Sequence, residues 1–354
     1  MYELWTNGMP YPAIEDMQSV KDAEYVTVHD SREGEYQFML GAAIIKHKGA
    51  FYCSWANSFR GENDDNTILA QKQSFDGGKT WQNYVRLSDK TVGFGRSHGV
   101  YLEHDGELYA FCPKAKFKEI THYPELKTEC YRLSPDGSAE NLGIVIDVDF
   151  WPMCQPIKLD DGGYLMAGLK AVCTLESRAA FARCDGSDIT KWEVSYPENP
   201  ENYDYWGEST VIKLENKLLA IIRGGMKAPC ALVSESFDGG RSWTPVQKTN
   251  MPAALSKMYA LNLSDGRICL VYNTASVKGR DTLCIATGKE SFDKVYTVRH
   301  GFDAPPKFGN ETKPWEWCYP YAYEDVEARK LYVAYSKHKE DCELCIIPID
   351  SLAL

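Results

Sequence analysis

Short apolar runs joined by tight polar turns recur along the chain. Residues 41–45 and 50–53 flank a Lys-Gly turn, and residues 99–102 and 107–111 flank an Asp-Gly turn. Two apolar runs separated by such a turn are typical of a β-hairpin, because glycine adopts the positive φ values that two-residue hairpin loops need. The pattern predicts six hairpins, at residues 41–53, 99–111, 155–166, 209–220, 258–270 and 321–334.

The spacing of these hairpins predicts the architecture. Their turns recur at intervals of 50 to 63 residues, which suits one four-stranded sheet with its loops. No segment keeps a helical period, and no Gly/Ser-rich or Pro-rich linker divides the chain. We therefore predict an all-β protein in which residues 1–354 form a single domain, a six-bladed β-propeller of four-stranded antiparallel blades.

A second signature follows two of the hairpins. Ser74–Trp81 reads Ser-Phe-Asp-Gly-Gly-Lys-Thr-Trp, and Ser236–Trp243 differs from it only by Arg for Lys and Ser for Thr. These residues indicate a turn, since an Asp carboxylate accepts hydrogen bonds from loop N–H groups and glycine supplies unusual φ values. One carboxylate per copy is too few for calcium. Weaker copies occur at residues 134–138, 185–192 and 291–293.

Charge and cysteine content narrow the functional classes. Asp and Glu outnumber Lys and Arg by 50 to 39, giving a net charge of −11, so nucleic acid is not an expected partner. With no apolar segment long enough for a membrane span and no signal-peptide pattern at the N-terminus, we expect a cytoplasmic protein without a membrane partner. The 12 cysteines are scattered through apolar runs, which favours reduced core thiols. We interpret the close pair Cys342 and Cys345 as strand cysteines, and expect no metal or cofactor.

The Ser-x-Asp-x-Gly-x-Thr-Trp copies resemble the Asp-box, or BNR repeat, of the sialidase superfamily. The resemblance implies a six-bladed propeller whose active site lies on the axial face, away from the Asp-boxes. Trp206-Gly207-Glu208-Ser209 is similar to the segment that holds the buried glutamate of the family. Arg223, which ends the following strand pair, is similar to the second active-site arginine.

The resemblance also implies a nucleophile. Arg280 lies in a segment similar to that of the third family arginine, and Tyr319 stands where the family places its nucleophilic tyrosine. Tyr321 is the alternative nucleophile and otherwise a substrate contact. Glu208 would take the phenolic proton, since a phenol with a pKa of about 10 is a weak nucleophile until a carboxylate activates it. Arg223 and Arg280 would bind the substrate.

The chain departs from the family at the start of its first unit. Sialidases carry an arginine there in a Phe/Tyr-Arg-Ile-Pro motif, whereas residues 36–40 read Tyr-Gln-Phe-Met-Leu. Because an arginine triad fixes the carboxylate of sialic acid, the sugar need not be a sialic acid here. Arg60 resembles a further site arginine. In the loop after it, where the family keeps its acid/base aspartate, the candidates are Glu62, Asp64 and Asp65, and we favour Asp65.

The second unit opens with a feature that we do not associate with sialidases, an Arg-Ser-His segment between glycines at residues 95–99. Arg96 and His98 head an inner strand, so both are expected to face the axis. There Arg96 would bind substrate and His98 would act as a general acid or base near neutral pH; the alternative for His98 is a bond to backbone at a strand end. Four tryptophans also precede inner strands and are candidates for stacking on a sugar, or for core packing: Trp151, Trp206, Trp315 and Trp317.

Three functions fit these observations. The leading one is a retaining exo-glycosidase that hydrolyses a terminal, acidic or otherwise polar sugar from an oligosaccharide or glycoside. The second is a lyase or unusual glycosidase that uses His98, Arg96 and a tyrosine, with proton abstraction beside a uronate carboxylate. The third is a non-catalytic carbohydrate-binding propeller. The sequence leaves the sugar, the linkage and the oligomeric state open.

Overall fold

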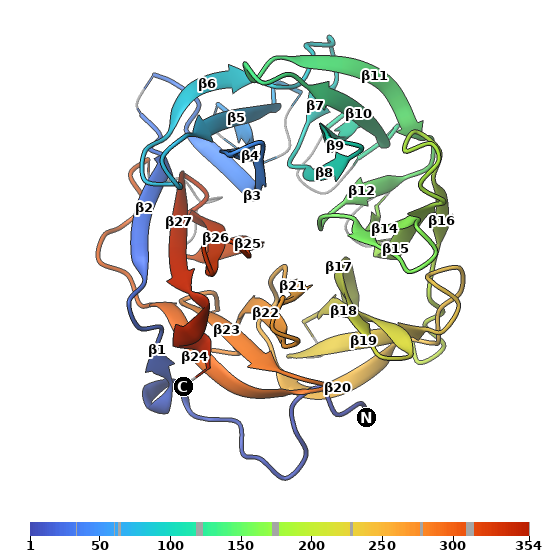
Figure 1. Ribbon diagram of the computed structural model, residues 1–354, viewed down its shortest axis with the longest axis vertical. Coiled ribbons are helices and arrows are strands. Elements are labelled where there is room, and N and C mark those ends of the chain that lie inside the picture. The colour runs from blue at the N-terminus through green and yellow to red at the C-terminus, as the bar shows by residue number, and fades with distance from the viewer. Residues whose placement is uncertain are drawn as a thin grey trace.

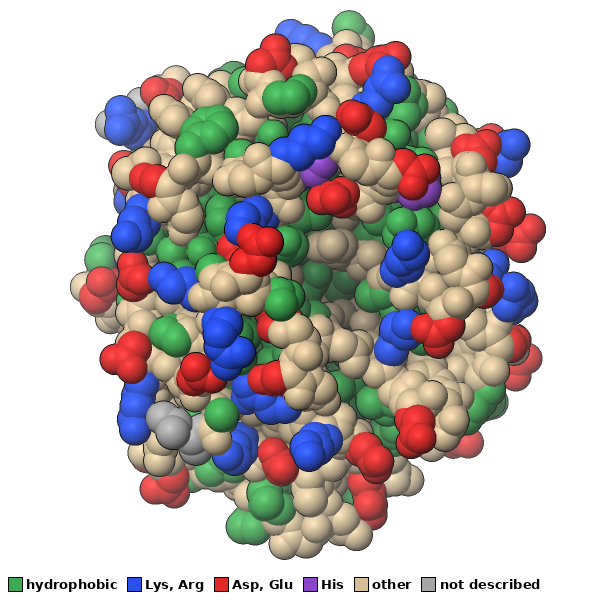
Figure 2. All heavy atoms as spheres, viewed as in Figure 1, with side chains coloured by type: hydrophobic (Ala, Val, Ile, Leu, Met, Phe, Trp, Pro, Cys, Tyr) green, Lys and Arg blue, Asp and Glu red, His purple; other side chains and the backbone are tan. Residues whose placement is uncertain are grey.

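Six antiparallel sheets stand radially around a central axis in the computed structural model (Figure 1). The structure describes residues 1–32, 34–59, 61–62, 65–117, 123–171, 177–226, 229–276, 279–308 and 315–353. The predicted six-bladed propeller is therefore confirmed. Charged side chains of both signs are interspersed over the face seen in Figure 2, which is hollowed near the axis.

Each predicted hairpin forms the two inner strands of one blade, and the next two strands complete the blade. Blade one consists of β3 (Phe38–His47), β4 (Ala50–Ser58), β5 (Ile68–Ser74) and β6 (Gln82–Arg86). Blade four consists of β17 (Tyr205–Leu214), β18 (Lys217–Gly224), β19 (Cys230–Ser236) and β20 (Gln247–Pro252). Blade five consists of β21 (Tyr259–Asn262), β22 (Ile268–Asn273), β23 (Thr282–Gly288) and β24 (Phe292–His300).

Blades two and three have an interrupted inner strand. In blade two, β7 (Gly95–Arg96) and β8 (Val100–His104) both pair with β9 (Glu107–Ala115), followed by β10 (Lys127–Leu133) and β11 (Ala139–Ile146). In blade three, β12 (Phe150–Pro152) and β13 (Ile157–Lys158) both pair with β14 (Tyr164–Lys170), followed by β15 (Arg178–Cys184) and β16 (Glu193–Ser195). If each interrupted strand is counted as one, both blades keep four strands.

The last blade is completed from the other end of the chain. It contains β25 (Trp317–Asp325), β26 (Lys330–Lys337) and β27 (Asp341–Pro348), and its outer strand is β2 (Glu24–His29). β2 runs antiparallel to β27, with Val26 opposite Leu344. This pairing closes the ring. The short strand β1 (Gln18–Ser19) pairs in parallel with β24, and two 3-10 turns lie at Ile14–Asp16 and Ile349–Leu352.

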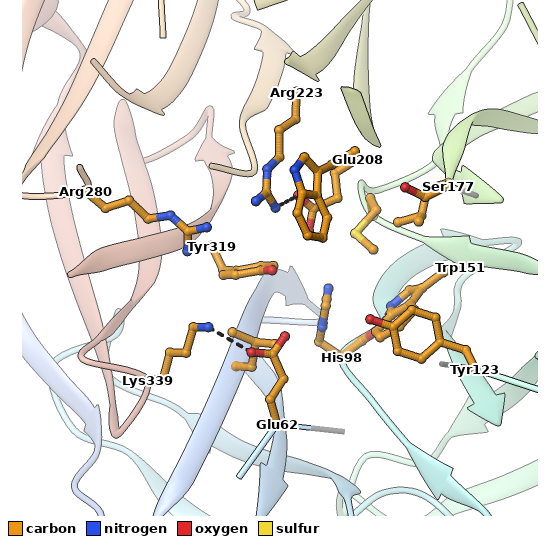
Figure 3. Close-up of a pocket in the computed structure, with 14 residues that line it drawn as sticks. Glu62, His98, Tyr123, Trp151, Ser177, Glu208, Arg223, Arg280, Tyr319 and Lys339 are labelled. Atoms are coloured by element: carbon orange, nitrogen blue, oxygen red, sulfur yellow. Dashed lines mark hydrogen bonds and ion pairs between the residues drawn. The ribbon is translucent and has the colours of Figure 1, made fainter. Parts of the chain in front are cut away.

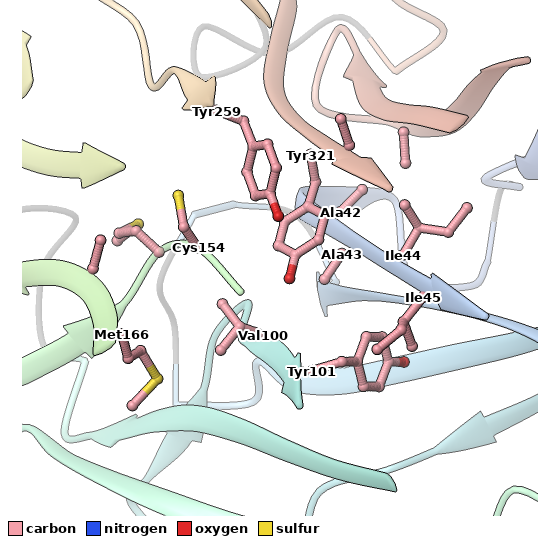
Figure 4. Close-up of a cluster of buried hydrophobic side chains, with 14 of the residues drawn as sticks. Ala42, Ala43, Ile44, Ile45, Val100, Tyr101, Cys154, Met166, Tyr259 and Tyr321 are labelled. Carbon is pink, nitrogen blue, oxygen red and sulfur yellow. The ribbon is translucent and has the colours of Figure 1, made fainter. Parts of the chain in front are cut away.

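Inner strands are apolar over nearly their whole length because neighbouring blades cover both of their faces. Nine of the ten residues of β3 are buried, whereas β6 at the outside has no buried residue. Figure 4 shows inner-strand side chains of different blades meeting near the axis. Among them, the rings of Tyr259 and Tyr321 lie 4.2 Å apart. The eleven cysteines in the described part of the chain are free thiols, and Cys342 and Cys345 are buried in β27 as strand residues.

The Asp-box carboxylates bind their own loops, as predicted. Oδ1 of Asp238 accepts hydrogen bonds from the backbone N–H groups of Arg241 at 3.0 Å and Ser242 at 2.9 Å. The Trp243 ring of the same loop stacks on Phe181 of blade three, with centroids 3.8 Å apart. The motif therefore fastens the outer part of one blade against its neighbour.

We predict that Asp238→Ala lowers the free energy of unfolding by about 1 kcal/mol, because loop N–H groups lose their acceptor. The slight burial of Asp238 acts to raise its pKa, but hydrogen bonds from Ser242, Ser236 and Arg241 outweigh this and lower it. The stabilisation is therefore complete above the unfolded pKa of about 3.9 and is lost as the pH falls through the lower folded value.

Chemical denaturation at pH 7 and at pH 3 measures the difference between Asp238→Ala and the unmodified protein. Asp293→Ala, at an exposed aspartate in the weakest copy of the motif, is the control and should be near neutral. An equal cost for both variants, or a cost for Asp238→Ala that grows on acidification, would contradict the assigned role.

Candidate active site

A pocket of about 190 Å³ lies on the axis where inner strands begin (Figure 3). All six blades contribute to its wall, because the propeller directs the start of every inner strand to the same end of the axis. Its lining consists of Leu40, Glu62, His98, Tyr123, Trp151, Met153, Leu169, Ser177, Trp206, Glu208, Arg223, Arg280, Tyr319 and Lys339. The four residues that the resemblance pointed to most directly, Glu208, Arg223, Arg280 and Tyr319, are together in it.

Glu208 and Arg223 form a buried ion pair on neighbouring strands of blade four. Nη1 of Arg223 donates a hydrogen bond to Oε2 of Glu208, and the two residues are 4% and 7% exposed. The register of β17 shifts between Tyr205 and Ser209, around Gly207 with φ +83°. A Cβ on Gly207 would lie 2.4 Å from the carbonyl carbon of Arg178, so glycine is required for the bulge that presents Glu208 to the axis.

Arg223 keeps Glu208 ionised. Burial alone would raise the pKa of Glu208, but the charge and hydrogen bond of Arg223 outweigh it and hold the pKa below its ordinary value. The guanidinium carbon of Arg223 also lies 4.8 Å from the centroid of the Trp206 ring. The pair is thus fixed on one side by an aromatic face.

Tyr319 projects into the pocket from a bulge in β25. The pairing of β25 with β26 shifts between Cys318 and Tyr321, and Tyr319 has φ +53°, an uncommon value for a residue with a side chain. The Nζ of Lys257 donates to the Pro320 carbonyl at 2.9 Å and so supports the bulge. Burial, reinforced by the charge of Glu208, raises the pKa of Tyr319 well above its ordinary value, so its phenol is neutral.

A chain of alternating charges runs along one side of the pocket. Nε and Nη2 of Arg280 donate to the Leu255 carbonyl at 3.1 and 2.9 Å, and Nη1 donates to Glu316 at 3.1 Å. Nζ of Lys339 lies 3.7 Å from Glu316 and donates to Glu62 at 2.8 Å. Leu255 and Glu316 therefore fix the position of Arg280, and Lys339 fixes that of Glu62. No sequence pattern pointed to Lys339 or Glu316, because their positions depend on the folding of blade six.

His98 lies in the break between β7 and β8. Its ring centroid is 5.2 Å from that of Trp151 and 5.5 Å from that of Tyr319. Burial, with a further contribution from Lys257, lowers the pKa of His98 to about 3. A neutral imidazole with this pKa neither carries an acidic proton nor takes one up readily, so this pKa disfavours the predicted role of His98 as a general acid or base near neutral pH.

Arg96 does not reach the pocket, contrary to the sequence-based prediction. Its Nε and Nη2 donate to the two carboxylate oxygens of Glu129, each at 3.0 Å, and it is 1% exposed. In a regular strand Arg96 and His98 would share a face, but the strand is interrupted between them. A Cβ at Gly99 would lie 2.1 Å from the Phe111 carbonyl oxygen, so this break depends on glycine.

Other predicted residues also lie elsewhere. Tyr321 is buried in the axial core against Tyr259 and does not line the pocket. Asp65 is exposed and outside the lining, whereas Glu62 of the same loop belongs to it. Arg60 and Asp64 lie outside the described residues.

Two of the four tryptophans line the pocket. Trp151 packs edge-on against Tyr123, with centroids 5.4 Å apart, and Trp206 lies over Arg223. Trp317 stacks instead on Phe302, and Trp315 is 49% exposed outside the lining. Tyr123, which sequence reasoning missed, follows a stretch without strand periodicity.

Within the described ranges, no three His, Cys, Asp or Glu side chains gather as a metal site requires. The same ranges contain no helix with the length and apolar character to cross a membrane.

Comparison with solved structures shows the fold. A protein of unknown function from Dyadobacter fermentans DSM 18053 is 15% identical with a TM-score of 0.70, covering 92% of this chain and 99% of that one. The Hadza microbial sialidase Hz136 is 13% identical with a TM-score of 0.69 over 92% and 68% of the two chains. Trypanosoma rangeli sialidase, solved with sialic acid, is 13% identical with a TM-score of 0.67, and the match covers 95% of this chain and 60% of that one.

No curated protein matches the chain. The profile of the BNR repeat-like domain matches residues 49–333, which is most of the sequence and includes four of the six inner hairpins completely. Together with the observed propeller and its Asp-boxes, this match shows that the chain belongs to the BNR repeat-like domain family, with a sialidase-like fold.

Proposed function

We propose that this protein is an exo-acting, retaining glycosidase that hydrolyses a terminal acidic sugar from an oligosaccharide or glycoside. The observation that supports this most is the convergence of a buried tyrosine, a glutamate and two arginines in one axial pocket: Tyr319, Glu208, Arg223 and Arg280. Its volume of about 190 Å³ is small enough to favour a single sugar ring, and thus removal of a terminal unit.

The cations favour an acidic sugar. Three of the five N–H groups of Arg280 donate to Leu255 and Glu316. The other two have no acceptor among the described residues and could donate to a ligand. Arg223 binds Glu208 through Nη1, while its Nε is buried without a partner in the part of the chain that the structure describes. A substrate carboxylate beside these groups would form charge-assisted hydrogen bonds in a site largely shielded from water.

Glu208 is suited to activate Tyr319. In the proposed first step, the phenolic proton passes to Glu208 as the phenolic oxygen of Tyr319 attacks the anomeric carbon, and the bond to the leaving oxygen breaks. A substrate carboxylate near Arg223 would share its positive charge, and would thereby raise the proton affinity of Glu208. Substrate binding would in this way strengthen the base when it is needed.

Glu62 is the described residue of the loop best placed to protonate the leaving oxygen. It lines the pocket, and Lys339 positions its carboxyl group at 2.8 Å. In the proposed first step Glu62 would enter in its protonated form and leave as the carboxylate. In the second step, Glu62 would take a proton from water as that water displaces the sugar from Tyr319. The proton on Glu208 then returns to the phenolate, which restores both residues.

We predict that Tyr319→Phe lowers kcat/KM for aryl glycosides of acidic sugars by at least about 10³-fold, because the nucleophile is lost. Glu208→Gln is expected to cost about 10²- to 10⁴-fold. Tyr321→Phe is the matched control: the Tyr321 ring is buried against Tyr259 outside the pocket lining, so removal of its hydroxyl should leave turnover close to normal.

Turnover of a panel of 4-nitrophenyl glycosides of acidic and neutral sugars measures these effects, and NMR of the first-formed product shows its anomeric configuration. Turnover that survives in Tyr319→Phe or Glu208→Gln would overturn the mechanism. An unsaturated uronate product would instead indicate a lyase, and binding without turnover of any substrate would indicate a carbohydrate-binding propeller.

The role of Glu62 has a separate test. Glu62→Gln should slow the cleavage of natural glycosides, whose leaving oxygen needs a proton, much more than that of 4-nitrophenyl glycosides, whose leaving group needs little help. Asp65→Asn, in the same loop but outside the pocket, should affect neither. An equal loss for both substrate types in Glu62→Gln would remove Glu62 from the acid/base role.

A further inference from the structure

Besides Nε of Arg223, a second polar atom of the pocket lining has no partner in the described part of the chain. Nε2 of His98 is buried and makes no hydrogen bond to any described residue. A buried polar atom left in this state is destabilising, so native proteins rarely keep one without a function. Because His98 lines the axial pocket, a ligand in that pocket is a natural partner for Nε2.

The imidazole is held firmly in place. Nδ1 lies 3.4 Å from the Ser97 hydroxyl, and the ring packs between Trp151 and Tyr319. Below the ring is Gly41, with φ +65°; a Cβ there would lie 2.1 Å from Cγ of His98. The ring therefore rests against backbone of blade one and has little freedom to turn away from the pocket.

Burial keeps His98 uncharged. Desolvation is the main reason for its low pKa of about 3; the buried ammonium of Lys257 lowers the pKa further, and Glu208 acts in the opposite direction. Tyr319, the other titratable group against the ring, is neutral. A neutral imidazole attracts a carboxylate weakly, whereas it exchanges hydrogen bonds readily with a hydroxyl group.

The two arginines of the pocket stand apart from this ring. Figure 3 shows Arg280 and Arg223 on the opposite side of the Tyr319 hydroxyl from His98. The pocket thus offers positive charge on one side and a neutral hydrogen-bonding atom, next to the Trp151 ring, on the other.

We propose that His98 is a specificity-determining residue whose Nε2 hydrogen-bonds an uncharged hydroxyl of the terminal sugar, while the carboxylate of that sugar lies on the arginine side. The inference rests on the proposed function and narrows its substrate class to sugar acids with a free hydroxyl opposite the carboxylate. A sugar without this hydroxyl leaves Nε2 unpaired, and sites of this kind discriminate strongly against such analogues.

The test uses the full-length Tyr319→Phe protein, whose expected lack of turnover permits binding to be measured alone. Free N-acetylneuraminic acid, glucuronic acid and galacturonic acid are titrated by calorimetry, and the ¹⁵N resonance of His98 Nε2, assigned with His98→Gln, is followed. We expect at least one sugar acid to bind and to shift this resonance, which should show no protonation above pH 5. His98→Leu in the same background should weaken Kd about 2- to 10-fold, and His98→Gln should restore part of the loss.

Gly41→Ala provides a second variant that leaves His98 in the chain. It displaces the imidazole and should weaken Kd as His98→Leu does. Gly49→Ala is the matched control, since Gly49 also has positive φ, +84°, but has open space around its Cβ position. Both variants carry similar backbone strain, and only the first disturbs the pocket.

The outcomes separate the two proposals. A sugar acid that binds without shifting the Nε2 resonance, or that binds His98→Leu and Gly41→Ala as tightly as the parent, overturns the assignment of His98 and leaves the proposed function intact. A panel in which no sugar acid binds, together with no turnover by the unmodified protein, overturns the proposed function and this inference with it.

Discussion

Closure of the ring is the constraint on which the rest of the structure depends. β2, from near the N-terminus, pairs with β27 near the C-terminus and completes blade six. Blade one then packs against blade six, and the contact of β3 with β25 brings the first and last inner strands together. Only in the closed ring do Glu62, Glu208 and Tyr319, which lie far apart in the sequence, line the same pocket. The pocket is therefore a property of the closed ring, since no single blade supplies its whole lining.

The electrostatic design of the pocket follows from its burial. Every cation on the wall has an acidic partner: Arg223 has Glu208, and both Arg280 and Lys339 have Glu316. Such pairing offsets the desolvation of charges that would otherwise be costly inside a protein. It also means that an anionic ligand must share these cations with carboxylates already present. In the proposed mechanism the ligand and Glu208 would be coupled through Arg223, so that binding and nucleophile activation would be parts of one event.

Local pattern was sufficient to predict the repeated parts of this protein. Hairpins and Asp-boxes are specified by residues close in sequence, so their turns and periodicity were visible, and the resemblance that they support led to Glu208, Arg223, Arg280 and Tyr319. Features that depend on distant packing were not predictable. The pairing of β2 is one, and the strand break that turns Arg96 toward Glu129 is another, because i and i+2 share a face only in an unbroken strand. Asp65 was favoured over Glu62 from loop position alone, which says nothing of where each side chain points.

Trapping of the covalent intermediate would decide whether Tyr319 attacks the sugar. The protein would be incubated with a fluorinated derivative of the acidic sugar whose aryl glycoside it cleaves. Fluorine next to the anomeric carbon slows both formation and breakdown of the intermediate. A good leaving group speeds formation alone, so the intermediate accumulates. Peptide mass mapping should find the sugar attached to Tyr319 alone, with no adduct in Tyr319→Phe. An adduct on Glu208 or Glu62, or none on Tyr319 in a protein that hydrolyses the parent glycoside with retention, would contradict the account.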